Sequence, residues 1–250
     1  MCRPASAPIQ PVARTKRSLV RDMFTAIAPR YDLLNHALSL NIDRRWRRLA
    51  VDRLGWQRAP KGRYLDLCAG TFDMAAELVR RSGFQGKLIA ADLVLEMVRR
   101  GCRKVPEVRA VVADALHLPF RSADFDGCTV GFGLRNLEDI DAGLAEIERV
   151  LKPGSTIVIL EFSTPKRWPI RPMYLFYFRR VLPLIGRLVS KHMTAYSYLP
   201  NSVAQFPGDE RLVERLGAHG FGGVEQLNLT SGVASLYWGY AKGVRDASDL

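Results

Sequence analysis

Apolar runs alternate with helical patterns over residues 63–162 of this 250-residue chain. The runs are short and rich in β-branched residues, as in buried strands. They predict strands at Arg63–Leu67, Lys87–Ala91, Val108–Val112, Phe125–Phe132 and Thr156–Glu161. Between them, helical patterns predict helices over about 73–82, 94–104 and 139–151. Strands that alternate with helices predict an α/β fold with a doubly wound, mostly parallel sheet.

Two helical regions flank this core in the sequence. Residues 17–58 carry apolar residues at helical spacing and predict an N-terminal helical cap. Residues 163–207 form a long aromatic and basic segment, and an insertion of that length is typical of a lid or binding element. We therefore expect a helical insertion over the acceptor site.

The rest of the chain completes one domain. A helix over 209–219 and strands at about 223–229 and 232–242 are expected to close the fold. Residues 1–16 are basic and lack the apolar stretch of a secretory signal, so they predict a disordered tail. The domain is then expected to span residues 17–250.

Three acidic residues stand at the ends of successive predicted strands: Asp66, Asp92 and Asp114. Ligands of open α/β sheets bind beyond the carboxyl ends of the strands. Asp92 has the place of a carboxylate that accepts hydrogen bonds from ribose hydroxyls, and Asp114 that of a residue beside an adenine amine. The alternative for any one of them is a carboxylate that merely ends a strand near water.

The loop after the first strand decides which cofactor fits. A dinucleotide site requires several glycines for close approach to a diphosphate. This loop has one, Gly70, with Phe72 where such loops usually carry another, and Asp66 adds negative charge before it. The pattern favours an adenosine cofactor without phosphate and with positive charge, which is S-adenosyl-L-methionine. Because no phosphate is bound, Phe72 is expected to have an ordinary negative φ.

Composition narrows the environment and the partners. Four scattered cysteines without ligand-like spacing to the four histidines predict neither a disulfide framework nor a metal site, and fit a reducing cytoplasm. The formal net charge of +12 favours a polyanionic partner, either nucleic acid or an anionic membrane surface.

Several motifs together resemble the ubiquinone/menaquinone biosynthesis C-methyltransferases, including demethylmenaquinone methyltransferase. They are YDLLN from Tyr31, DALHLPF from Asp114, GFGLRN from Gly131, RVLKPG from Arg149 with LEFS from Leu160, and YLPNS from Tyr198. The chain departs from the family pattern at Asp43, Phe72, Gly131 and Tyr237.

The resemblance implies a class I, Rossmann-like S-adenosylmethionine-dependent methyltransferase that methylates a ring carbon of a prenylated quinol. It implies cofactor contacts at Thr71, Asp92, the Asp114-Ala115 pair and the main chain of Gly131. Such an enzyme is expected in the cytoplasm, peripheral to the inner face of the cytoplasmic membrane.

Ring methylation requires an electron-rich carbon, which a phenolate provides. Arg135 is the cation that we expect to favour the phenolate, with Asn136 orienting a ring oxygen and Tyr31 closing over the ring. His36, His117 and Tyr196 are weaker candidates for a base.

The segment 168–188 is aromatic and apolar but contains arginines, so it predicts an interfacial helix or a lid over a prenyl tail rather than a membrane span. A helix packed on the core is the alternative.

Other functions remain as alternatives. A nucleic-acid methyltransferase is disfavoured, because the loop after the fourth strand is GFGLRN and Cys128 lies within that strand. An O- or N-methyltransferase on another lipophilic acceptor, and a non-catalytic cofactor-binding subunit, both stay open. The sequence allows a homo-oligomer.

Overall fold

The computed structural model describes residues 15–32, 39, 41–177, 180 and 193–243, and of residues 193–197 only the backbone. The expected tail over residues 1–16 lies outside this range except for its last two residues. Of these, Thr15 caps helix α1 (Lys16–Ile27) by accepting a hydrogen bond from the Ser18 N–H. The cap region therefore begins at the end of the expected tail.

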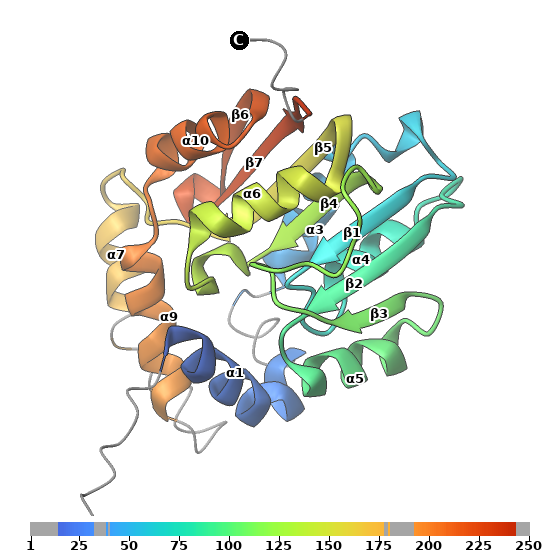
Figure 1. The fold of residues 1–250 in the computed structure, drawn as a ribbon. Helices are drawn as coiled ribbons and strands as arrows, with labels where there is room; N and C mark the ends of the chain where they lie inside the picture. Colours follow the sequence, from blue (N-terminus) through green and yellow to red (C-terminus); the bar gives the residue numbers. More distant parts are fainter. Residues whose placement is uncertain (1–14, 33–38, 40, 178–179, 181–192, 244–250) are drawn as a thin grey trace, which may run out of the picture.

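Seven strands form one mixed sheet in the order β3-β2-β1-β4-β5-β7-β6 (Figure 1). Their bounds are β1 Arg63–Leu67, β2 Lys87–Asp92, β3 Arg109–Val112, β4 Phe125–Gly131, β5 Leu151–Phe162, β6 Phe221–Leu229 and β7 Ala234–Ala241. All neighbours are parallel from β3 to β5, and β7 runs antiparallel to both β5 and β6. The prediction of a doubly wound, mostly parallel sheet is confirmed. Strand β5 begins before the predicted Thr156, because Leu151 already pairs with Phe125.

Helices cover both faces of the sheet (Figure 1). They are α3 Ile42–Arg53, α4 Asp73–Val79, α5 Leu95–Lys104, α6 Ile140–Val150 and α10 Asp209–Ala218. Strand β1 shows how the core divides: Tyr64 packs in one cluster with α3, α4 and α5, whereas Leu65 and Leu67 pack in another with α6 and α10. The fold is thus a three-layer sandwich.

The remaining helices lie beyond the carboxyl ends of the parallel strands (Figure 1). They are α1, α7 Ile170–Phe176 and α9 Met193–Gln205, with a 3₁₀ turn η1 at Ala28–Arg30. Helix α1 and η1 belong to the predicted N-terminal cap, and α7 and α9 to the predicted insertion. The strand order reverses between β1 and β4, so the ligand site of such a sheet is expected where these helices gather.

The expected negative φ at Phe72 is wrong. Phe72 has φ 70° and ψ 32°, in the left-handed region, as the residue that precedes α4. Cys68 and Gly70 of the same loop also have positive φ. The path of the chain from β1 into α4 therefore imposes this conformation, whether or not a phosphate is bound. For a residue with a side chain it costs roughly 1–2 kcal/mol.

Burial of the Phe72 ring offsets this cost. The side chain is 0% exposed and belongs to the core cluster that contains α3, α4 and α5. It lies against Gly101 of α5, where an added Cβ would approach the ring to 2.4 Å. The aromatic ring thus occupies the space that a side chain at position 101 would need.

This packing predicts coupling between the two positions. Gly101→Ala should destabilise the parent protein by roughly 1–3 kcal/mol, because the methyl group overpacks the core. Phe72→Gly should cost about 3–5 kcal/mol for the lost aromatic, less about 1 kcal/mol for relief of the left-handed backbone. In the Phe72→Gly background Gly101→Ala should become neutral or stabilising. Denaturant unfolding of all four proteins measures this, and equal effects of Gly101→Ala in both backgrounds would contradict it.

Candidate active site

A cavity of about 80 Å³, open to solvent on one side, lies at the point where the strand order reverses. Its floor comes from the ends of β1, β2, β3 and β4 and the loops that follow them: Leu67, Cys68, Gly70, Asp92, Leu93, Val94, Ala113, Asp114, Ala115, Leu116, Gly131, Phe132, Gly133 and Asn136. Its outer side is built by Arg17, Val20, Phe24 and Tyr31. We call residues 16–32, which carry these side chains, the N-terminal wall.

Asp92, at the end of β2, is held by main-chain donors on both oxygens. Oδ2 accepts a hydrogen bond of 2.8 Å from the Gly70 N–H, and Oδ1 accepts one of 2.8 Å from the Val94 N–H. Burial raises the pKa of Asp92, while these hydrogen bonds oppose the rise. Each carboxylate oxygen can accept a second hydrogen bond, so the group can still receive hydroxyl donors from the cavity.

Asp66 lies outside the cavity lining, beneath the loop of residues 68–72 that joins β1 to α4. One oxygen accepts a hydrogen bond from the Ala75 N–H (3.1 Å) and the other from the Thr129 hydroxyl (3.0 Å). Burial raises its pKa to about 7. Asp66 thus supports the start of α4, and a role of its charge beside the cofactor stays a prediction.

Thr71 also lies outside the cavity lining. It is 3% exposed, and its hydroxyl hydrogen-bonds Oδ1 of Asp32 in the N-terminal wall. A direct cofactor contact of its side chain stays a prediction; the structure gives it a contact to the wall.

Asp114 and Ala115 both line the cavity after β3. Asp114 Oδ1 accepts a hydrogen bond from the Leu116 N–H, and Oδ2 forms an ion pair of 3.0 Å with Arg17 Nε. Helix α1 is thereby fixed to the end of the cavity that the sequence assigned to adenine.

Of the three residues expected at the acceptor, two line the cavity and the third, Arg135, does not. Tyr31 and Asn136 line the cavity, and Asn136 Oδ1 accepts a hydrogen bond of 3.1 Å from the Tyr198 hydroxyl of α9. Gly131 lines it as well, and a Cβ there would approach Met74 to 2.9 Å. A larger residue at position 131 would therefore displace the methionine.

Arg135 is buried, with 8% exposure, and lies outside the lining of this cavity. Its Nη1 pairs with Glu161 Oε1 and donates to the Phe132 carbonyl (2.6 Å). Glu161 is 0% exposed and was not singled out as a site residue, although it belongs to the LEFS motif. The Arg135 Nε is buried without a hydrogen-bond partner in the described part of the chain. The expected cation is present, but both donors of its Nη1 serve the protein itself, one the Glu161 carboxylate and one the Phe132 carbonyl.

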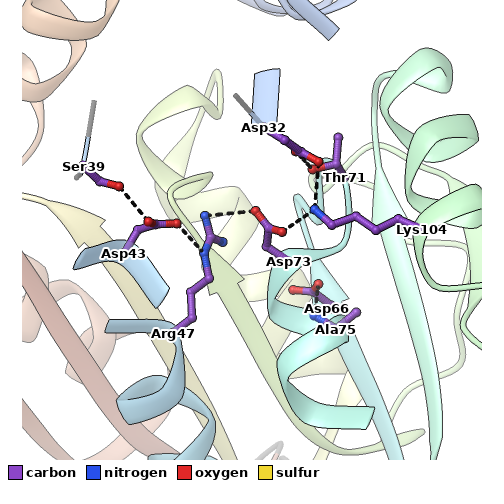
Figure 2. A network of polar contacts seen from close by, with 9 residues as sticks. All are labelled: Asp32, Ser39, Asp43, Arg47, Asp66, Thr71, Asp73, Ala75 and Lys104. Atoms are coloured by element: carbon purple, nitrogen blue, oxygen red, sulfur yellow. Dashed lines mark hydrogen bonds and ion pairs between the residues drawn. The ribbon is translucent and has the colours of Figure 1, made fainter. Parts of the chain in front are cut away.

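A chain of polar contacts ties the N-terminal region to α4 and α5 (Figure 2). Lys104 Nζ contacts Asp32 at 2.8 Å and also pairs with Asp73 in the first turn of α4. Arg47 of α3 pairs with Asp73 at 3.4 Å and with Asp43 at 3.3 Å. Asp43, one of the departures from the family pattern, thus faces a guanidinium.

Of the three candidate bases, the structure describes the side chain of His117. His117 is exposed and does not line the cavity. His36 and the side chain of Tyr196 lie outside the described residues. Where the chain is described, no three His, Cys, Asp or Glu side chains are grouped so that they could hold a metal ion.

The comparisons with known proteins agree with this architecture. The ubiE/COQ5 methyltransferase family matches residues 12–241. The chain is 43% identical over 230 residues to a ubiquinone/menaquinone biosynthesis C-methyltransferase from Geotalea daltonii, covering 90% of this chain and 97% of that protein. It is 46% identical over 221 residues to a demethylmenaquinone methyltransferase from Thermus thermophilus, covering 87% and 99%.

Solved structures show the same fold at low sequence identity. The crystal structure of the [4+2]-cyclase SpnF has a TM-score of 0.67 at 16% identity and covers 94% of this chain and 98% of its own. A methyltransferase from Thermotoga maritima, described as a possible histamine N-methyltransferase, has a TM-score of 0.60 at 16% identity, with 88% and 98% covered. Since the family match extends over most of the chain, the protein belongs to the ubiE/COQ5 methyltransferase family.

Proposed function

We propose that this protein transfers the methyl group of S-adenosyl-L-methionine to a ring carbon of a prenylated quinol, converting demethylmenaquinol to menaquinol. The observation that carries the proposal is the cavity at the sheet's switch point, where Asp92 and Asn136 line the same space. Relatives named for this reaction are matched over nearly their full length. The precursor of ubiquinone is a second acceptor of the same class.

The cavity lining fits an adenosine cofactor without phosphate. Asp92 would hold the ribose hydroxyls, Asp114 and Ala115 would lie beside the adenine, and Val94 and Met97 provide apolar surface. A diphosphate would meet a loop with a single glycine and a carboxylate at its base. When bound, S-adenosylmethionine supplies the electrophilic methyl group.

The acceptor is assigned to the side of Asn136 and Tyr198. The Tyr198 hydroxyl donates to Asn136 Oδ1, which leaves the Asn136 amide to orient a ring oxygen. Its Nδ2 makes only a long contact of 3.4 Å to the Phe132 carbonyl. Arg135 would favour the phenolate through its Nε and its positive field, although Glu161 offsets part of that charge.

A second cavity, of about 390 Å³, lies beside the insertion and fits the need for space around a lipidic acceptor. It is lined by Phe162, Ser163, Thr164, Pro165, Lys166, Arg171, Val203, Phe206, Pro207, Gly208, Asp209 and Tyr237. Near it, Trp168, Met173 and Phe176 are 85%, 68% and 64% exposed. Within the described residues, no helix is long and apolar enough to cross a membrane. We therefore assign α7 and its basic neighbours to peripheral contact with an anionic membrane surface, at the inner face of the cytoplasmic membrane.

Turnover of a short-chain demethylmenaquinol with S-adenosylmethionine tests the function directly. The expected products are the ring-methylated quinol and S-adenosylhomocysteine in equal amounts, identified by mass spectrometry. Asp92→Ala should weaken cofactor binding by roughly 1–3 kcal/mol, because ribose hydroxyls lose their acceptor. Methylation of an oxygen or nitrogen instead would support the other methyltransferase class. Binding without turnover on any quinol would support a non-catalytic subunit.

Arg135→Lys separates the catalytic role of Arg135 from its structural one. Lysine keeps the charge beside Glu161 but has no equivalent of Nε, so turnover should fall by roughly 10²-fold while cofactor affinity stays within about twofold. The loss should shrink as pH rises toward the phenol pKa of about 10, where the quinol ionises unaided. Equal loss of cofactor affinity and turnover would make Arg135 structural. Arg135→Ala is not a clean test, because a lone buried Glu161 costs about 3–5 kcal/mol of stability.

Vesicle sedimentation tests the membrane contact. The protein should bind vesicles that contain anionic lipid and dissociate as salt rises, since the attraction is screened. Phe176→Ser should weaken binding severalfold, because it removes an exposed apolar side chain from the contact. Leu227→Ser is the matched control, since Leu227 is an exposed apolar residue, 39% accessible, on β6. Equal effects of both substitutions would contradict the assignment of α7.

A further inference from the structure

The N-terminal wall is attached to helix α5 at both ends of that helix. At its start, Ala28 packs with Val94 and Met97, and Phe24, Ile27 and Tyr31 pack against that cluster. At its end, Lys104 contacts Asp32. The first contact is apolar and the second is ionic, so their strengths can be changed independently.

The ionic contact reaches the β1–α4 loop directly. Asp32 receives the Lys104 ammonium on Oδ2 and the Thr71 hydroxyl on Oδ1. The same ammonium pairs with Asp73, the first residue of α4 (Figure 2). Lys104 therefore joins a carboxylate of the wall to a carboxylate that follows the loop, and Thr71 adds a hydrogen bond between the same two parts.

The position of Tyr31 connects these contacts to the cavity. Tyr31 precedes Asp32 in sequence, and a Cβ on Gly70 would lie 3.6 Å from its ring. Both Tyr31 and Gly70 line the cavity, and the Gly70 amide is the donor to Asp92. Whatever holds Asp32 therefore holds the Tyr31 ring over the loop on which the ribose-binding carboxylate depends.

Burial and helix polarity hold Lys104 firmly on Asp73, whereas Asp32, its partner in the wall, is 39% exposed. The side chains of Lys104 and Asp73 are 29% and 12% exposed, so water screens their attraction only in part. Lys104 is in the last turn of α5, where the helix dipole favours a cation. Asp73 is in the first turn of α4, where the dipole favours an anion.

We propose that Asp32 and Lys104 are positioning residues that keep the N-terminal wall closed on the β1–α4 loop and so set the residence time of the cofactor. The inference rests on the proposed cofactor, because the retained ligand is S-adenosylmethionine. Neither side chain lines the cavity. They act through Tyr31 and Gly70.

Two variants of the full chain test the proposal. Lys104→Met keeps the aliphatic stem and removes the charge, and Asp32→Asn keeps an acceptor for Thr71 while removing the carboxylate by which the wall pairs with Lys104. Lys152→Met is the matched control, since Lys152 pairs with Asp126 at the same 2.8 Å, at the opposite ends of the strands. Lys104→Arg keeps the charge and should behave as the parent.

The first measurement is amide hydrogen exchange of residues 16–32 without ligand. Exchange should quicken by about fivefold in Lys104→Met and Asp32→Asn, the factor for loss of one moderate ion pair, and stay unchanged in Lys152→Met. The double variant should differ little from Lys104→Met, because both substitutions remove the same contact. Unchanged exchange in both single variants would overturn the closed wall.

The second measurement is the dissociation rate of S-adenosylmethionine by stopped flow. It should rise by about fivefold in the same two variants, with association changed less, and remain at the parent value in Lys152→Met. If the parent binds the cofactor and both variants release it at the parent's rate, the positioning role is overturned. A parent that binds no cofactor would overturn the proposed function, while hydrogen exchange would still decide whether Asp32 and Lys104 hold the wall.

Discussion

The hydrogen bond from the Gly70 amide to Asp92 is the contact on which the site depends. It fastens the loop after β1 to the end of β2, two points separated by the whole of α4. Cys68, Gly70 and Phe72 of this loop have positive φ, and the Ala69 amide also donates to the Ala91 carbonyl of β2. Asp92 fixes that arrangement from one side and the N-terminal wall covers it from the other. The floor of the cavity therefore depends on main-chain geometry, while the side chains of the wall close its outer side.

Charges around the cavity are mostly engaged within the protein. Arg17 faces Asp114, Arg135 faces Glu161, and Lys104 and Arg47 share Asp73. Each pairing lowers the cost of placing charge near the core, and each reduces the field that a ligand would experience. A quinol oxygen would accordingly interact with individual donors of fixed direction, rather than with an open basic surface.

Much of the fold could be predicted, because its signals are local. The parallel strands and the helices between them follow from apolar periodicity, and Asp92 could be placed at a strand end without a structure. The partners of Arg135 and Lys104 could not. Glu161 and Asp32 are distant from them in sequence, and a carboxylate in a strand or beside a tyrosine gives no local sign of its partner. The positive φ of Phe72 could not be predicted for a related reason. The path of the chain between β1 and α4 determines this angle, and the choice of ligand does not.

The contact between Phe72 and Gly101 restricts how this sequence can change over time. A side chain at position 101 is destabilising while the ring is present, and loss of the ring leaves a void while position 101 is glycine. The residue tolerated at each position therefore depends on the residue already present at the other. A relative with a small residue at position 72 can tolerate substitutions at position 101. A relative with phenylalanine at position 72 should favour glycine at position 101. Relatives should accordingly show the two positions varying together, although Phe72 precedes α4 and Gly101 lies within α5.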